Sequence, residues 1–236
     1  MPQLLIDDLR IEVVRKNIRS LRLTVYAPDG RVRVAAPLRT ADAAIHAFVS
    51  ARRAWIRKHQ EQFAAREQPA ELEYVSGETH FYQGQPYELR VHETAAGPLR
   101  VKLLEDGFLD LFAPAGSTRE QREKALHSWY RARLKEQLPA LAARWEPVVG
   151  KQAAEWGIKL MRTRWGTCSI RARRIWLNLE LIKQPPHCLD YVVVHELVHL
   201  HERLHNARFW GLMDQFMPDW QVAKQALRSV HLKPCG

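Results

Sequence analysis

One short stretch of this chain gathers residues that can bind and use a metal ion. His195, Glu196 and His199 fit the pattern H-E-x-x-H. Residues four apart lie on one face of an α-helix, so both imidazoles can reach a single ion. Glu196 follows the first histidine, where its carboxylate can reach a water molecule on the metal without being a ligand itself. The spacing therefore predicts a metal-dependent hydrolase with Glu196 as its general base.

His205 is the expected third ligand. A random shuffle of this composition gives H-E-x-x-H about 4 times in 100, but only about 2 times in 1000 when a histidine six residues later is also required. A straight helix would turn His205 roughly 100° away from the first two histidines. We therefore expect the helix to end after about His201 and the chain to turn between Leu204 and Asn206. Asparagine tolerates the left-handed conformation that a helix end often needs.

Two aspartates remain alternatives as the third ligand, because Asp214 and Asp219 lie on the following segment. His201 would project to the wrong side of a continuing helix, and Glu202 is too close along it to swing onto the ion. Three nitrogen ligands would leave a fourth tetrahedral position for water, which is the arrangement of catalytic zinc. Zn²⁺ is the expected cofactor rather than iron or nickel, since geometry and availability decide such choices more than affinity does.

A second motif is expected to lie opposite this helix. The stretch RTRWGTCS, residues 162–169, combines arginines, a tryptophan and a glycine that permits a close backbone approach. It can present an edge strand to which an extended peptide adds by hydrogen bonding. The alternative is a basic hairpin loop packed by Trp165. The candidates for stabilising an oxyanion are Arg164, Asn178 and Tyr191.

The N-terminal part of the chain is predicted to be rich in strands. Residues 18–36 alternate apolar and polar side chains on both sides of Pro28-Asp29-Gly30, which predicts a hairpin. Thr40 is placed to cap a helix that extends to about residue 66. Short apolar runs between residues 79 and 112 predict about three further strands.

The C-terminal part is predicted to mix helices with a pair of strands. Ser117 opens a region of one or two helices, with a kink near Pro139 or Pro147. Strands are expected at residues 158–163 and 174–181, and helices at 189–202 and 209–230, with a turn at Pro218. The chain is thus expected to have an α+β fold in two parts. A β-rich region with one helix covers residues 1–115, and a part that carries the histidines covers residues 116–236.

The composition limits the class of protein. A chain of 236 residues, 46% of them hydrophobic, can bury the core of one large domain or two small ones. The first residues carry acids where a secretory signal needs positive charge, and no apolar run approaches the roughly 18 residues that span a bilayer. We therefore expect a cytoplasmic protein without a membrane segment. Cys168, Cys188 and Cys235 lack C-x-x-C spacing, so neither a disulfide framework nor a cysteine-built zinc site is expected.

The motifs, taken together and in order, resemble those of the YgjP-like zinc metallopeptidases, relatives of the SprT and WLM groups within the zincins. The resemblance rests on RTRWGTCS, on the stretch from RRIWLNLEL to HNARFW, and on MPDW, and it covers about Arg122 to Leu232. It implies a zincin-like catalytic domain over residues 116–236. It also implies metal ligands at His195, His199 and His205, Glu196 as catalytic base, and a cleft lined by residues 164–166 and 177–179. The candidate substrate-binding residues that follow from it are Arg164, Trp165, Gly166 and Asn178.

Three functions remain open from the sequence. The first is a zinc-dependent metallopeptidase that cleaves peptides or proteins. The second is a phosphohydrolase acting on nucleotides, of the nucleoside triphosphate pyrophosphatase type, in which Arg162, Arg164 and Arg208 bind the charge of a phosphorylated small molecule. The third is a nucleic-acid-associated protease of SprT type. The 36 Lys and Arg against 26 Asp and Glu leave a net charge of +10, which favours a weak contact with nucleic acid.

Overall fold

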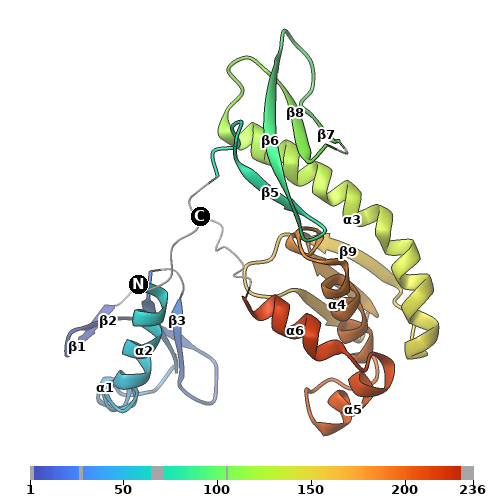
Figure 1. The fold of residues 1–236 in the computed structure, drawn as a ribbon. Coiled ribbons are helices and arrows are strands. Elements are labelled where there is room, and N and C mark those ends of the chain that lie inside the picture. Colours follow the sequence, from blue (N-terminus) through green and yellow to red (C-terminus); the bar gives the residue numbers. More distant parts are fainter. Residues whose placement is uncertain (1–2, 27–28, 65–71, 105, 230–236) are drawn as a thin grey trace. The chain divides into compact units, whose positions relative to one another are not determined.

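The computed structural model describes residues 3–26, 29–64, 72–104 and 106–229. Figure 1 shows a mixed α+β protein, and the described residues form eleven strands and six α-helices. The chain divides into two compact units, Met1–Glu71 and Leu72–Gly236. The α+β class predicted from the sequence is confirmed. The division, however, falls after Glu71 and not near residue 115, for a reason that lies in the packing of the second unit.

Unit 1 is a four-stranded sheet with two short helices. Its strands are in the order β1-β2-β4-β3, and β3 pairs with β4 as the predicted hairpin. Every second residue of β4 is buried, namely Val32, Val34 and Ala36, which gives the sheet one apolar face against the helices. The elements are β1 (Gln3–Ile6), β2 (Leu9–Lys16), β3 (Arg22–Tyr26), β4 (Arg31–Pro37), α1 (Asp42–Ser50) and α2 (Arg53–Ala64).

Two features of unit 1 differ from the sequence prediction. Strands β1 and β2 were not expected, and the single long helix is two helices. Thr40 is not the N-cap of α1, since Ala41 occupies that position and makes no side-chain hydrogen bond to the helix. Pro28 of the hairpin turn lies outside the described residues, as does the predicted end of the helix near residue 66.

Unit 2 begins with a second four-stranded sheet and a long helix. The strands, one more than predicted, are in the order β5-β6-β8-β7. Thr118 caps the helix in a reciprocal capping box with Gln121, and one continuous helix passes both Pro139 and Pro147. The elements are β5 (Thr79–Tyr82), β6 (Gln85–Thr94), β7 (Arg100–Leu103), β8 (Phe108–Pro114) and α3 (Arg119–Val149).

The packing of α3 explains why the chain does not divide near residue 115. Leu126, Tyr130 and Leu134 lie on one face of α3 and are fully buried. They share a core with Leu89 and Leu111 of the preceding sheet and with the elements that follow. The Tyr130 hydroxyl also donates a hydrogen bond of 2.9 Å to the carbonyl of Phe81. Strands β5 to β8 therefore belong to the same unit as the histidine cluster.

A smaller sheet follows α3. Its order is β10-β11-β9, with β11 antiparallel to β10 and parallel to β9, so β10 is an edge strand. Gly157 of β9 is required by a close approach, because a Cβ there would lie 2.3 Å from the ring of Trp176. The three strands are β9 (Glu155–Lys159), β10 (Gly166–Ser169) and β11 (Arg174–Asn178).

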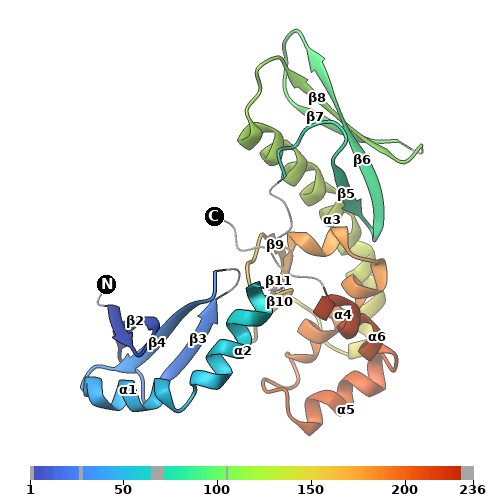
Figure 2. The same cartoon turned by 60° about the vertical axis from the view of Figure 1, so that its left-hand side comes forward.

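The central helix of unit 2 is α4 (Pro186–Val198), which follows a 3₁₀ turn at Leu179–Lys183. Proline at its first turn suits a helix start, and nine of its thirteen residues are buried. Figures 1 and 2 show α5 (Ala207–Phe216) and α6 (Trp220–Ser229) grouped with α4. Val230, the last residue of the predicted final helix, lies outside the described residues. Among the residues that are described, no helix is long and apolar enough to cross a membrane.

Candidate metal centre and active-site cleft

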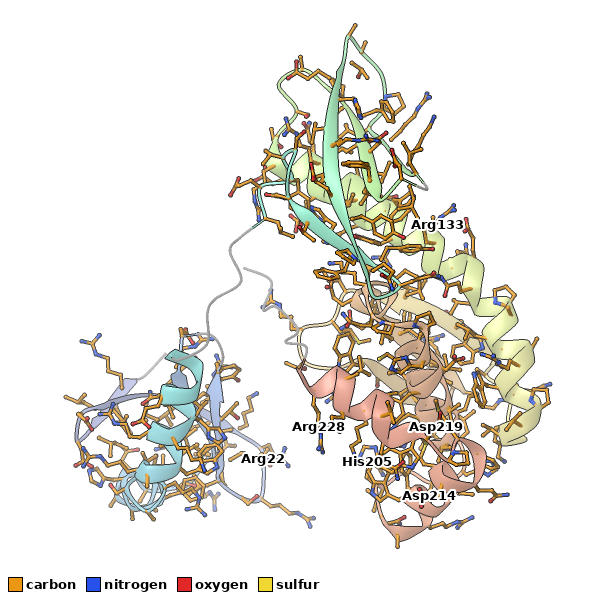
Figure 3. All side chains as sticks on the ribbon, viewed as in Figure 1. Arg22, Arg133, His205, Asp214, Asp219 and Arg228 are labelled. Carbon is orange, nitrogen blue, oxygen red and sulfur yellow. The ribbon has the colours of Figure 1, made fainter. Side chains whose placement is uncertain are left out.

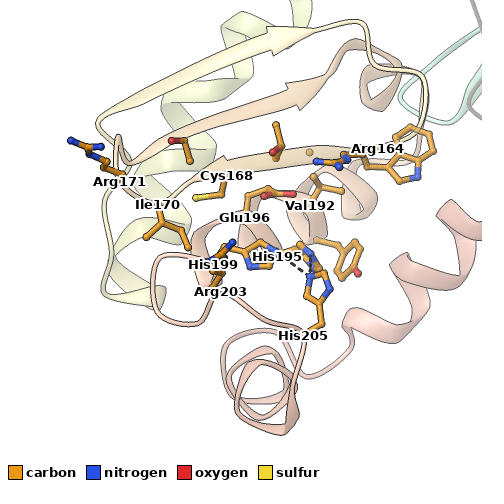
Figure 4. Close-up of a pocket in the computed structure, with 15 residues that line it drawn as sticks. Arg164, Cys168, Ile170, Arg171, Val192, His195, Glu196, His199, Arg203 and His205 are labelled. Atoms are coloured by element: carbon orange, nitrogen blue, oxygen red, sulfur yellow. Dashed lines mark hydrogen bonds between the residues drawn. The ribbon is translucent and has the colours of Figure 1, made fainter. Parts of the chain in front are cut away.

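Three histidine side chains converge at the end of α4. His195 lies in the last turn of α4, His199 is its C-cap residue, and His205 lies in the loop before α5. The Nε2 atom of His205 is 3.0 Å from Nε2 of His195 and 3.1 Å from Nε2 of His199 (Figure 4). Within the described residues these three make up the one group of His, Cys, Asp or Glu side chains with metal-binding geometry.

The two aspartates left open as third ligand are not part of this group. Asp214 accepts a hydrogen bond of 2.8 Å from the indole of Trp220. Figure 3 labels His205, Asp214 and Asp219, and neither aspartate lines the cleft around the histidines. His201 points elsewhere, since its Nε2 is 2.8 Å from the carbonyl of Val149 at the end of α3. The spacing argument thus selected the histidines that the fold brings together.

The loop from Glu202 to Asn206 delivers His205 without a glycine. Helix α4 ends at Val198, a few residues before the predicted end. The Glu202 carboxylate accepts a hydrogen bond from the backbone N–H of Leu204, and the Asn206 side chain accepts one from the N–H of Phe209. Asn206 is in an extended conformation with φ of −91°, so the expected left-handed asparagine is wrong. It acts as the N-cap of α5 instead.

Hydrogen bonding and burial favour neutral imidazoles with free Nε2 atoms. The Nδ1 atom of His199 lies 3.1 Å from the Glu202 carbonyl, which can only accept, so Nδ1 carries the proton. Burial lowers the pKa of His195 to about 3, with a further contribution from the neighbouring histidines. Burial also lowers the pKa values of His199 and His205. The metal-binding form of a histidine is the neutral one.

Glu196 lies in a buried position under strand β10. Its side chain is only 5% exposed, and burial raises the pKa of its carboxyl to about 8, against a lowering by Arg164. Its Oε2 atom is buried without a hydrogen-bond partner. Gly166 of β10 lies directly against it, because a Cβ there would be 2.6 Å from Oε1 and 2.8 Å from Cγ of Glu196. The glycine therefore allows the edge strand to approach the carboxylate.

The cleft around these groups has a volume of about 980 Å³. Of the predicted substrate-binding residues, Arg164, Trp165 and Gly166 line it, together with Tyr191 and the remainder of β10. Trp165 is half-buried and packs against the core of the unit. Arg164 is exposed at the mouth of the cleft. The edge-strand hypothesis for residues 162–169 thus agrees with the position of β10.

Asn178 does not line the cleft. Its side chain is fully buried and uses all of its hydrogen-bonding capacity within the protein. Its amide donates to the carbonyls of Met161 and Arg164 at 2.8 and 2.7 Å, and its oxygen accepts from the N–H groups of Met161 and Glu180 at 3.2 Å. The expectation that Asn178 contacts substrate is therefore corrected. It holds the loop that leads into β10, because no donor is left to face the cleft.

The sequence analysis did not identify two aromatic residues of the site. Phe209 is fully buried, and the centroid of its ring lies 4.7 to 4.9 Å from those of all three imidazoles. The indole N–H of Trp210 donates to the carbonyl of His205 at 3.1 Å. The available signal was their position three and four residues after Asn206, since an asparagine N-cap fixes where the first turn of the next helix points.

Comparison with known proteins places the chain in a family. The family model described as YgjP-like, metallopeptidase domain matches residues 19–230. The chain belongs to this family, which makes it a hydrolase of the metallopeptidase class and implies that it uses a metal. The match also covers most of unit 1, beyond the part that the sequence motifs marked. Neither nucleic acid nor phosphorylated substrates receive support from it.

A solved structure gives a further similarity of limited extent. The crystal structure of the metallopeptidase zymogen of Pyrococcus abyssi abylysin shares 20% identity with the chain, at a TM-score of 0.35. The similarity covers 39% of this chain and 89% of that one. No curated protein matches the chain.

Proposed function

We propose that this protein is a zinc-dependent peptidase whose zincin-like site is formed by His195, Glu196, His199 and His205. The observation that carries the proposal is the convergence of three Nε2 atoms, with two separations of 3.0 and 3.1 Å. Neutral imidazole nitrogens repel one another through their lone pairs unless a cation or a proton lies between them. Zinc sites that keep an open position commonly use three protein ligands of this kind.

The fit of the residues to zinc is supported by their surroundings. The proton on Nδ1 of His199 leaves its Nε2 lone pair directed at the cluster. Within the described residues no cysteine and no carboxylate joins the group, which argues against a softer thiolate site or an all-oxygen site. Phe209 covers the imidazoles from one side and holds them in an apolar setting.

When bound, zinc would acidify a water molecule and polarise the substrate carbonyl. The protein's own groups would then move the proton. Glu196 accepts it at a carboxylate oxygen and later delivers it to the leaving amine of the cleaved peptide bond. Burial raises the pKa of this carboxyl, which makes the carboxylate a stronger proton acceptor, and its Oε2 has no hydrogen-bond partner in the protein. Burial keeps bulk water from competing for that proton.

Strand β10 would hold the substrate. As the edge strand of its sheet, it offers unpaired backbone N–H and C=O groups along the wall of the cleft. An extended peptide could add to it as a further strand, which brings one of its carbonyls beside Glu196. Arg164 and Tyr191 both line the cleft, and they are our candidates for the donor that stabilises the oxyanion.

Two substitutions test the proposal together. Glu196→Gln should retain bound zinc and lose turnover of a casein substrate, because it removes the base and leaves the ligands in place. His199→Ala should lose both the metal and the turnover. Full activity in Glu196→Gln would show that the assigned base is wrong.

A parallel substrate screen separates peptide hydrolysis from the nucleotide alternative. Casein cleavage and the release of phosphate or pyrophosphate from nucleoside triphosphates should be measured on the same zinc-loaded preparation. We expect cleavage of casein. Turnover of nucleotides alone would overturn the peptidase assignment, and the metal site would then serve phosphoryl chemistry.

A further inference from the structure

The exposed charged side chains of the active-site cleft are all positive. Three arginines line it, namely Arg164, Arg171 and Arg203, and all three are exposed. The only acid among the lining residues is Glu196, which is buried. Field lines from several like charges are concentrated within a concave surface, so this cleft attracts anions more strongly than the same charges would on a flat surface.

These arginines lack the acidic partners that Arg90 and Arg144 of the same unit have. Arg90 pairs with Asp110 at 2.8 Å, and Arg144 pairs with Asp190 at 3.1 Å. Within the described part of the chain, none of the three cleft arginines forms an ion pair. Arg164 does act on the charge of Glu196, but at a distance. Their guanidinium groups therefore have hydrogen-bond donors available for a carboxylate, which arginine can bind with two parallel bonds.

The three groups flank the position where a substrate strand would lie. Arg164 precedes β10 and Arg171 follows it, so they mark its two ends, as Figure 4 shows. Arg203 lies on the opposite wall, in the loop that carries His205. A strand advances about 3.3 Å per residue, so a peptide paired with the four residues of β10 extends about 13 Å. Side chains on both sides of the scissile bond would then approach an arginine.

We propose that the cleft selects peptides with acidic side chains on both sides of the scissile bond. This inference rests on the proposed peptidase function and adds a substrate class to it. The backbone of the substrate would pair with β10, and its carboxylates would meet Arg164 and Arg171 at the two ends and Arg203 across the cleft.

The test compares two peptides that differ only in charge. One carries Glu on both sides of an alanine-rich scissile segment, and the other carries Gln at the same positions. Binding is measured by fluorescence anisotropy on the full-length Glu196→Gln protein, and kcat/KM is measured on the wild type. We expect a preference of about tenfold for the Glu peptide in both measurements, and a smaller preference at high salt.

Variants assign the preference to the cleft. The ratio between the two peptides should fall to about fivefold in Arg171→Gln and in Arg203→Gln, and to about twofold when both substitutions are combined. Lys135→Gln removes one positive charge from an exposed position on α3 outside the cleft and should leave the ratio unchanged. Zinc content measured for each variant excludes an indirect effect of Arg203 on the loop that carries His205.

The outcomes separate this inference from the proposed function. Cleavage of both peptides at equal rates with equal binding would overturn the inference and leave the peptidase assignment intact. Preferential binding of the Glu peptide without any cleavage would support the inference as a binding specificity and refute the peptidase function. Turnover of nucleoside triphosphates without binding of the Glu peptide would overturn both.

Discussion

The close approach of Gly166 to Glu196 gives the sharpest prediction. In Gly166→Ala the added Cβ would lie 2.6 Å from Oε1 and 2.8 Å from Cγ of Glu196, and 2.9 Å from Cγ1 of Val192. Ordinary contacts begin near 3.4 Å, so either the carboxylate or the strand must move by 3.4 − 2.6, or about 0.8 Å. Backbone strain plays no part, because the φ angle of Gly166 lies outside the left-handed region.

The size of the effect follows from that displacement. Misplacing a catalytic group by about 1 Å can cost a factor of about 100 in rate. Packing an additional methyl group into a filled site costs about 1–3 kcal/mol of stability. We therefore expect kcat of Gly166→Ala to fall about 10- to 100-fold, with a modest loss of thermal stability. Bound zinc should remain, because the three atoms nearest to the new methyl group belong to Glu196 and Val192 and not to a histidine.

The assay needs kcat, zinc content and the unfolding temperature of the same preparation. Gly211→Ala is the matched control, since Gly211 lies inside α5 and a Cβ there meets no atom within 4 Å. It should keep its activity and gain about 0.5–1 kcal/mol of stability from the better helix propensity of alanine. A Gly166→Ala protein with wild-type kcat would refute the assigned position of the base beneath β10.

Three further predictions concern stability. Zinc at 1,000 times its Kd should stabilise unit 2 by about 4 kcal/mol, and a chelator should remove this stabilisation. Calorimetry with and without the chelator measures the resulting fall in unfolding temperature. Asn178→Ala should cost about 2–4 kcal/mol in urea unfolding, because it leaves buried backbone groups of the loop before β10 without partners; an unchanged midpoint would contradict the positioning role. Although burial opposes it, hydrogen bonds from Arg90 and His92 hold the pKa of Asp110 below its ordinary value of 3.8. The resulting stabilisation is present above pH 3.8 and is lost as the pH falls through the lower folded-state pKa, so Asp110→Asn should weaken the fall in stability in acid. If stability fell equally with decreasing pH in the wild type and in Asp110→Asn, Asp110 would not be the source of this stabilisation.

The local part of the site was predictable from the sequence. Helical periodicity alone brings His195 and His199 together. Because a continuing helix would turn His205 away from them, the helix had to end before it. The way in which it ends was not predictable from residue types. Glu202 and Asn206 form the turn through hydrogen bonds. Asn206 is the N-cap of α5 and has an extended, not a left-handed, conformation.

Most of the predictions that were wrong concern features that depend on contacts between distant segments of the chain. The boundary near residue 115 was placed where strands give way to a helix, but α3 shares its core with the sheet before it. Asn178 was assigned to the cleft from the family resemblance, whereas its four hydrogen bonds turn it inward. Strands β1 and β2 form a local hairpin and were missed for another reason, since its turn has Asp7 at a φ of 54° where a glycine would have marked the turn.

Anomalous diffraction at the zinc absorption edge tests the central claim most directly. Crystals of the full chain should be grown with zinc and measured on both sides of the edge. We predict one strong anomalous peak at about 2.0–2.1 Å from the Nε2 atoms of His195, His199 and His205. A map with His205 turned away and no peak between the other two histidines would contradict the proposed metal centre and the enzymatic function built on it.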